Sequence, residues 1–115
     1  MAGKLVHRRP DWVRRFIAAE KARASMPFTW GMHDCCMATV GMIQVMTGVD
    51  VAPNLRGYKT KRGAAGMLKR NCPKGFPIHD RLRYVADQIA FDHGLEKVGP
   101  KFAQRGDPVL METAT

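Results

Sequence analysis

The sequence has little acidic charge, few aromatic residues and no long hydrophobic run. Ten Asp and Glu residues face 19 Lys and Arg residues, which gives a formal net charge of +9 at neutral pH. Such a charge permits binding to nucleic acid, to anionic glycans or to an acidic protein, and it selects none of them. Aromatic residues make up only 8% of the chain and no nucleic-acid-binding motif is present, so we expect a solvated basic surface and no nucleic-acid partner.

Membrane spans, signal peptides and disulfides are also not indicated. No apolar run approaches the roughly 20 residues that cross a bilayer, and Arg14 and Arg15 interrupt any hydrophobic region near the start. The three cysteines, Cys35, Cys36 and Cys72, are an odd number, and adjacent cysteines rarely pair with each other. Unpaired thiols are typical of a protein made in a reducing cytoplasm.

The length of the chain and the spacing of its apolar residues predict a basic arm followed by one domain that contains several helices. A chain of 115 residues suffices for one core, and we expect a mobile arm over residues 1–10 and a single domain over residues 11–115. Helices are predicted over residues 12–23, 35–47, 63–70 and 81–93. The helix at 35–47 is apolar nearly all round, so we expect it to be the central buried helix.

Buried faces and helix ends follow from the same pattern. The expected buried side chains of the first and last helices are Trp12, Val13, Phe16, Ile17, Ala19, Leu82, Val85, Ala86 and Ile89. Asp11, Asp34 and Asp80 are predicted N-caps, and Gly48 and Gly94 are predicted helix ends.

Two short apolar segments near the end of the chain predict strands, at residues 95–98 and 109–111, the second following Gly106-Asp107-Pro108. The expected fold class is therefore α+β, with a central helix and a small antiparallel C-terminal sheet. A lone terminal strand would expose unpaired edges. It could pair with residues 95–98, join a sheet of a neighbouring chain, or belong to a domain that is incomplete at Thr115.

The most distinctive stretch is Phe28-Thr29-Trp30-Gly31-Met32-His33-Asp34-Cys35-Cys36. It predicts a loop that delivers two cysteines onto the first turn of a helix. Cys35 would lie where the positive end of the helix dipole favours a thiolate, so Cys35 is the candidate nucleophile. The alternative is that both cysteines are buried structural thiols.

A cysteine nucleophile needs a base, usually a histidine that a third polar group orients. His7 lies on the expected arm, and His33 is only two residues from Cys35. His79 and His93 lie at opposite ends of the helix expected at 81–93, and either is a candidate base. Zinc is the other chemistry considered, but no CxxC pair and no second pair at ligand spacing is present, so no metal and no cofactor is expected.

Two parts of the sequence together resemble the NlpC/P60 superfamily, papain-like cysteine peptidases of which many act on cell-wall peptides. These parts are Trp30-Gly31-x-x-Asp34-Cys35 before an apolar helix, and Gln104-Arg105-Gly106-Asp107-Pro108-Val109-Leu110. The sequence is more similar still to a small family of uncharacterised proteins encoded in the tail modules of tailed phages and prophages. That similarity covers most of the length and includes Asp11-Trp12-Val13-Arg14-Arg15, the box from Phe28 to Cys36, Thr47-Gly48-x-Asp50 and Leu55-Arg56-Gly57-Tyr58.

The resemblance implies a reduced, apparently degenerate peptidase domain. It matches Cys35 to the nucleophile and Asp34 to the residue before it, with Trp30, Gly31, Gly106 and Asp107 as structural motif residues. The peptidases take their histidine from strands after the Gly-Asp pair, whereas this chain has no histidine after Gly106.

We therefore expect a structural minor tail protein of a tailed bacteriophage, at the tail tip or baseplate. It would be made in the bacterial cytoplasm, reside in the virion and contact other tail-tip or hub proteins. One alternative is an active phage-tail peptidoglycan peptidase with Cys35 as nucleophile and a histidine from His79, His93 or a neighbouring chain. A second alternative is a basic nucleic-acid-binding module. The basic region 56–74 is the expected contact for any anionic partner.

Overall fold

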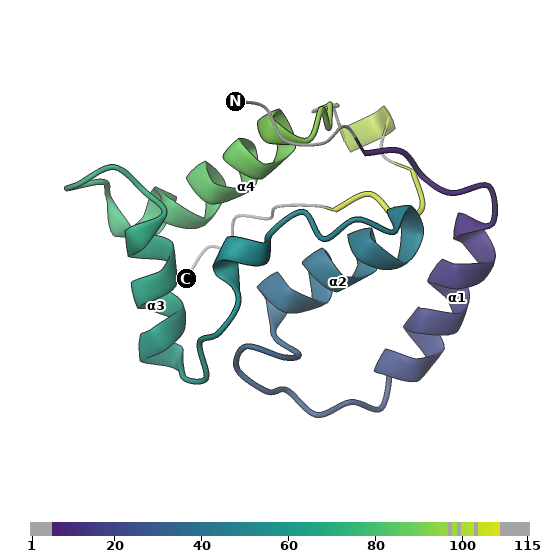
Figure 1. Ribbon diagram of the computed structural model, residues 1–115, viewed down its shortest axis with the longest axis horizontal. Helices are drawn as coiled ribbons and strands as arrows, with labels where there is room; N and C mark the ends of the chain where they lie inside the picture. Colours follow the sequence, from purple (N-terminus) through teal and green to yellow (C-terminus); the bar gives the residue numbers. More distant parts are fainter. Residues whose placement is uncertain (1–5, 97, 99, 103, 109–115) are drawn as a thin grey trace.

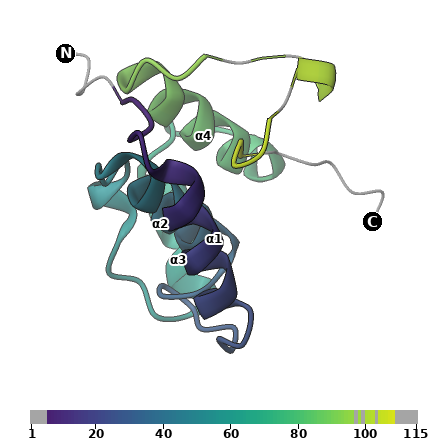
Figure 2. The ribbon, with the colours of Figure 1, turned by 90° about the vertical axis from the view of Figure 1, so that its right-hand side faces the viewer.

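The computed structural model describes residues 6–96, 98, 100–102 and 104–108. Four α-helices follow one another along the chain: α1 (Trp12–Arg23), α2 (Cys35–Thr47), α3 (Lys61–Arg70) and α4 (Arg81–Asp92). Short 3-10 helices lie at Pro53–Leu55, Ile78–Asp80 and Pro100–Phe102. Helix α1 packs along α2 and α3 packs against α4 (Figure 1). Turned by 90°, the molecule shows α4 at the end opposite the loop that joins α1 to α2 (Figure 2).

The core is built around α2, as its apolar sequence predicts. This helix buries four side chains, Met37, Val40, Ile43 and Met46, more than any other helix of the described residues. The remaining core side chains come from the segment before α1, the stretch that follows α2, helix α3 and helix α4: Val6, Val51, Ala52, Leu55, Met67 and Val85. Gly48 ends α2 with a φ of 77°, the left-handed conformation expected of a C-terminal glycine.

The predicted α+β fold is wrong, and with it the reduced NlpC/P60-like architecture. The described residues form helices and no β-strand, with a single isolated bridge between Thr29 and His33. Leu95 donates its N–H to the carbonyl of Ala90, so the start of the expected 95–98 strand closes α4 instead. Val98 is 49% exposed, and a short strand without a partner is unstable. The expected strand at 109–111 lies outside the described residues.

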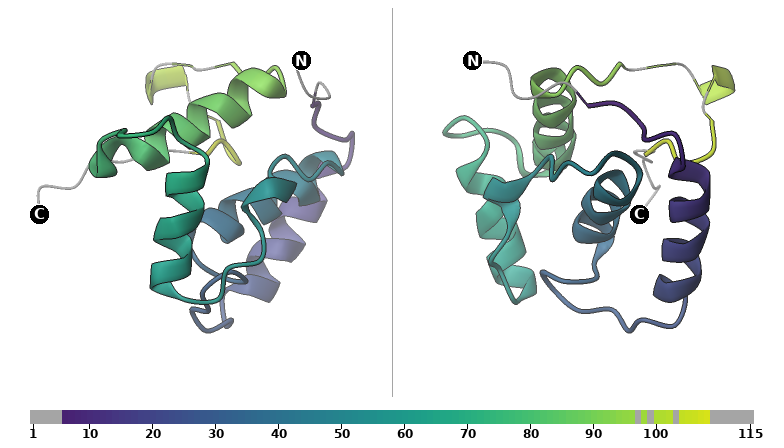
Figure 3. Two further views of the ribbon diagram at one scale, coloured as in Figure 1. Left: turned by 60° about the vertical axis from the view of Figure 1, so that its left-hand side comes forward. Right: turned by 45° about the vertical axis from the view of Figure 1, so that its right-hand side comes forward.

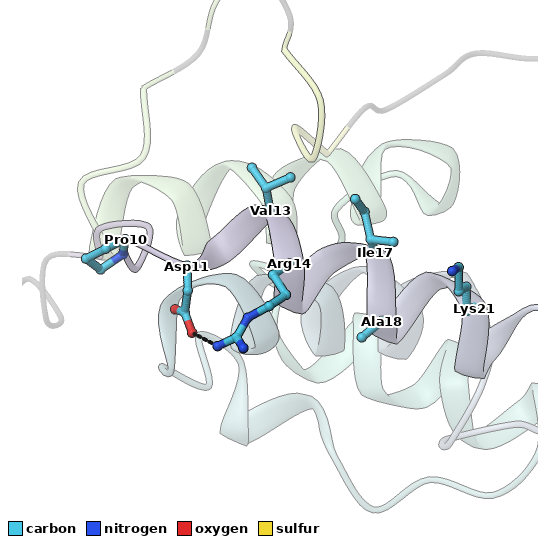
Figure 4. A pocket seen from close by; sticks show the side chains of 7 residues that line it. All are labelled: Pro10, Asp11, Val13, Arg14, Ile17, Ala18 and Lys21. Atoms are coloured by element: carbon cyan, nitrogen blue, oxygen red, sulfur yellow. Dashed lines mark hydrogen bonds and ion pairs between the residues drawn. The ribbon is translucent and has the colours of Figure 1, made fainter.

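Two predicted buried faces are narrower than expected. No side chain of α1 is fully buried; Trp12 and Phe16 are half-buried against α2, whereas Val13 and Ile17 are 38% and 37% exposed. Both line an open groove on the outer side of α1 (Figure 4). In α4 only Val85 is buried. A helix at the edge of a four-helix arrangement packs on one side only, so its flanking apolar residues remain at the surface.

Two of the three predicted N-caps, Asp11 and Asp80, occupy the N-cap position but do not make the expected side-chain bond. The carboxylate of Asp11 makes no capping bond and instead accepts from the guanidinium groups of Arg14 and Arg15, at 3.1 and 2.9 Å. Asp80 likewise makes no side-chain capping bond to α4. Only Asp34 caps its helix as the sequence predicts.

The basic segment before α1 is bonded to the helices from Val6 onward. Val6 lies in the core and donates its N–H to the carbonyl of His93 at 3.2 Å. Arg9 donates its N–H to the carbonyl of Met46 at 2.8 Å. The guanidinium of Arg8 lies 4.3 Å above the Trp12 ring. The expected arm is therefore part of the helical body over residues 6–10. None of the helices in the described ranges is both long and apolar enough to cross a membrane.

Candidate functional site

The loop between α1 and α2 is fixed by a glycine that no other residue could replace without strain. Gly31 has a φ of 81°, a conformation that favours glycine. A Cβ added there would lie 1.8 Å from the carbonyl oxygen of Tyr58, which is backbone and cannot rotate away. Gly31 thus lets the loop lie directly against the segment that precedes α3.

The carboxylate of Asp34 joins this loop, the start of α2 and Tyr58. Its Oδ1 accepts from the N–H of Met37 at 2.8 Å, which is the predicted N-cap. Its Oδ2 accepts from the N–H of Gly31 at 2.8 Å and from the hydroxyl of Tyr58 at 2.6 Å. Asp34 is only 4% exposed. We call these four residues, Gly31, Asp34, Met37 and Tyr58, the Asp34 clasp.

The clasp shifts the ionisation of both its acidic groups. Burial raises the pKa of Asp34, but the bonds from Met37, Tyr58 and Gly31 outweigh it, so the pKa lies below its ordinary value. Burial raises the pKa of Tyr58, and the adjacent Asp34 carboxylate raises it further. The stable pair is therefore an ionised Asp34 and a neutral Tyr58, which is the arrangement for one strong hydrogen bond.

The two adjacent cysteines have different surroundings. Cys35, on the first turn of α2, is exposed, and Cys36 is half-buried next to the core. Burial, and then the neighbouring Cys35, raise the pKa of Cys36 to about 12. Cys36 is thus held as a neutral thiol, whereas Cys35 is open to solvent. Of the two alternatives for these residues, the buried structural thiol describes Cys36 but not Cys35.

No described histidine hydrogen bonds to Cys35. The side chain of His79 is 84% exposed and lies 3.5 Å from the carboxylate of Asp80. The Nδ1 of His93 lies 3.0 Å from the carbonyl of Ile89 at the end of α4. Both histidines flank α4, and α4 lies across the molecule from the loop that leads to Cys35 in every view (Figures 1 to 3). The geometry therefore supplies an exposed thiol at a helix start without bringing either candidate base to it.

The second motif pair, Gly106 and Asp107, lies in a turn near Met46, at the C-terminal end of α2. Asp107 accepts from the N–H of Gln104 at 2.7 Å and forms an ion pair with Arg8. A Cβ on Gly106 would lie 2.8 Å from the Sδ of Met46 and 3.2 Å from the Trp12 ring. This pair therefore ties the last described residues to the segment before α1, and we call Arg8, Gly106 and Asp107 the terminal clamp.

Two aromatic residues, Trp30 and Tyr58, also belong to the site. Trp30 is half-buried, and its ring meets the exposed Phe28 edge to face, with centroids 4.8 Å apart. Tyr58 is the site residue that sequence reasoning missed. No local pattern around Tyr58 marks it as a site residue, and only the fold brings it to Asp34, 24 residues earlier.

A metal centre is not evident in the described part of the chain. That part contains no group of three or more His, Cys, Asp or Glu side chains that could hold a metal ion. The chemistry that the site offers is therefore that of the thiol at Cys35 and of the hydrogen-bonded Asp34 carboxylate.

Comparison with protein families gives a match over most of the chain. A family model described as "Domain of unknown function (DUF6950)" matches residues 7–115. No curated protein and no solved structure matches the chain. The match begins one residue after Val6, so it includes both the Asp34 clasp and the terminal clamp.

Proposed function

We propose that this chain, which belongs to the DUF6950 family, is a structural minor tail protein without peptidase activity. It would lie at the tail tip or baseplate of a tailed bacteriophage. It would be made in the bacterial cytoplasm and assembled into the virion with other tail-tip or hub proteins. The resemblance to the tail-module family supports this role, because that family shares the box from Phe28 to Cys36 and the segment that contains Tyr58.

One observation supports the proposal that the protein has no peptidase activity. The Asp34 carboxylate accepts hydrogen bonds from two backbone N–H groups and the Tyr58 hydroxyl, so the most peptidase-like residues of the sequence are used to close the loop. A thiol at a helix start becomes an efficient nucleophile only with a positioned base. Cys35 has no described histidine as a hydrogen-bond partner, and this favours a structural use of the box.

The test uses a phage or prophage whose tail module encodes the chain. Mass spectrometry of purified tails should find the protein, and electron microscopy should find normal tails when Cys35→Ser replaces the natural residue. Asp34→Ala, which removes the clasp, should reduce the number of complete tails. The proposal is wrong if purified tails lack the protein, or if the isolated protein cleaves a peptidoglycan stem peptide and Cys35→Ala abolishes the cleavage.

The second candidate is an active cell-wall peptidase, and the exposure of Cys35 on the first turn of α2 favours it. Its base would be a histidine of a neighbouring chain, or His79 or His93 after a rearrangement. Rapid alkylation of Cys35 near pH 6, together with stem-peptide cleavage, would support this candidate, since the thiolate and not the thiol reacts. Slow alkylation without cleavage would support the structural role.

A further inference from the structure

The end of the molecule that carries the Asp34 clasp presents apolar side chains to solvent. Met26, Phe28 and Met32 lie on the loop between α1 and α2 and are 48%, 62% and 79% exposed. Three large apolar side chains on seven residues of loop are more than isolated surface exposure explains. Aromatic and methionine side chains are also enriched where proteins bind one another.

The same end carries positive charge. Gly31 lies against the backbone of Tyr58, so the loop is beside the segment that begins α3. That segment contributes Lys59, Lys61 and Arg62, all exposed. The joining loop and the start of α3 lie at one end of the molecule in the views of Figures 1 and 3. We call Met26, Phe28, Met32, Lys59, Lys61 and Arg62 the loop end.

The two carboxylates between Lys21 and His79 are already engaged, whereas Glu20, near the end of α1, is exposed. From Lys21 to His79 the only acidic residues are Asp34 and Asp50. Asp34 is buried in the clasp, and Asp50 accepts from the guanidinium of Arg56 at 2.8 Å. Lys59, Lys61 and Arg62 form no ion pair with any residue that the structure describes. The positive charges of Lys59, Lys61 and Arg62 are therefore available to bind an anionic group of another molecule.

The loop backbone that carries these apolar side chains is fixed by hydrogen bonds before any partner arrives. Thr29 and His33 exchange backbone hydrogen bonds of 3.1 and 2.8 Å, and Met32 donates its N–H to the carbonyl of Thr29 at 3.1 Å. Such preorganisation lowers the cost of fitting side chains into a partner's pocket. A bilayer needs no fixed spacing of inserted side chains, and a phosphate backbone makes little use of apolar ones. The observations therefore favour a protein surface.

We propose that the loop end docks onto an acidic partner protein, with Phe28 and Met32 entering an apolar pocket and Lys59, Lys61 and Arg62 facing the carboxylates around it. The proposal rests on the structural role above in one respect, because a tail component needs a neighbour. Central buried aromatic anchors surrounded by a charged rim are the usual anatomy of such an interface.

The test selects binders from a displayed library of random peptides on the immobilised full-length protein. Selected peptides should combine an aromatic or aliphatic residue with flanking Asp or Glu. Their dissociation constants, measured by fluorescence anisotropy, should rise about 10-fold or more in Phe28→Ser/Met32→Ser. Lys59→Glu/Lys61→Glu/Arg62→Glu should weaken binding similarly, and higher salt should weaken binding to the natural protein.

Matched control variants lie elsewhere on the surface. Lys69→Glu/Arg70→Glu/Lys74→Glu makes the same charge change around the other end of α3, and Val13→Ser/Ile17→Ser removes exposed apolar groups from α1. Both should leave peptide binding within about 2-fold of the natural protein, a change of about 0.4 kcal/mol or less. Circular dichroism spectra should confirm that all four variants fold.

Three outcomes would overturn the proposal. They are selected peptides without acidic enrichment, equal losses in the control variants, and binding to phosphatidylglycerol vesicles or duplex DNA in place of peptides. None of these outcomes bears on whether the protein lacks peptidase activity or is present in tails. The tail and cleavage experiments test those two points separately. Conversely, cleavage of a stem peptide would end the structural proposal and leave this docking surface standing.

Discussion

Asp34 and Asp107 each join segments that are distant in the sequence, but they do so in different surroundings. Asp34 is 4% exposed and accepts only from uncharged donors, two backbone N–H groups and a tyrosine hydroxyl. Asp107 is half-buried and pairs with the charged Arg8, 99 residues away. Removing a buried acceptor leaves its donors unsatisfied, whereas water can replace a partly exposed ion pair. The clasp should therefore matter more to stability than the clamp.

The largest effect is expected from Asp34→Ala. This change removes a helix cap and leaves the N–H groups of Gly31 and Met37 and the Tyr58 hydroxyl without their acceptor. The free energy of unfolding should fall by about 3 kcal/mol, from the loss of a cap and the exposure of buried donors. Urea denaturation followed by circular dichroism measures it. A fall of less than about 1 kcal/mol would mean that the Asp34 clasp contributes no more to stability than an ordinary surface interaction.

Acid should weaken the clasp next. The pKa of Asp34 is lower in the folded protein than its ordinary value, so the folded state binds fewer protons than the unfolded state. The stability that this carboxylate contributes is complete above about pH 4 and is lost as the pH falls through the lowered pKa.

Unfolding free energies of the natural protein and of Asp34→Asn, measured from neutral pH to about pH 3, separate this effect from that of other carboxylates. The difference between the two proteins should shrink as the pH falls. A difference that stays constant over this range would mean that Asp34 is not the titrating group.

The terminal clamp should give a smaller and salt-dependent effect. Asp107→Asn removes the charge that faces Arg8 while keeping an acceptor for the N–H of Gln104. The expected loss is below about 1 kcal/mol at low salt and less in high salt, because half-exposed ion pairs are screened. Thermal unfolding in low and high salt measures it. A loss that matched that of Asp34→Ala would remove the distinction between clasp and clamp.

The smallest effect is expected from Cys35→Ser. The Cys35 thiol is exposed, and no core side chain rests on it. Its replacement should change the free energy of unfolding by less than about 0.5 kcal/mol, as is usual for surface substitutions. The same urea titration measures it. A large loss here would show that the thiol itself, and not the neighbouring carboxylate, organises the loop.

The sequence predicts those parts of the fold that local chemistry determines. The predicted bounds of α1 and α2 agree with those in the structure. Asp34 and Gly48 mark the two ends of α2 in the sequence, and the spacing of apolar residues marks α1. Helix α3 begins at Lys61, two residues before the predicted start, because Thr60 caps it through the N–H of Gly63 at 3.0 Å. Thr60 is not one of the three N-caps that the sequence predicts.

The errors concern what tertiary packing decides. An apolar segment such as residues 95–98 predicts a strand only if a partner strand exists, and Leu95 bonds back to α4 instead. Val13 and Ile17 have the spacing of a buried face, but packing against α2 leaves them at the surface. The bond between Asp34 and Tyr58 could not be predicted, since no local pattern relates two residues 24 positions apart. The sequence thus locates the candidate site through the N-cap Asp34, but it does not reveal the hydrogen-bond partner Tyr58.

The most direct test of the clasp is a double-mutant cycle of Asp34→Asn and Tyr58→Phe, measured by urea denaturation. If the Tyr58 hydroxyl donates to Asp34 as the 2.6 Å distance indicates, the two changes should be coupled by about 1–2 kcal/mol, as for hydrogen bonds to charged groups. Changes that add to within about 0.3 kcal/mol would contradict the central claim that the loop before Cys35 serves to hold the fold together.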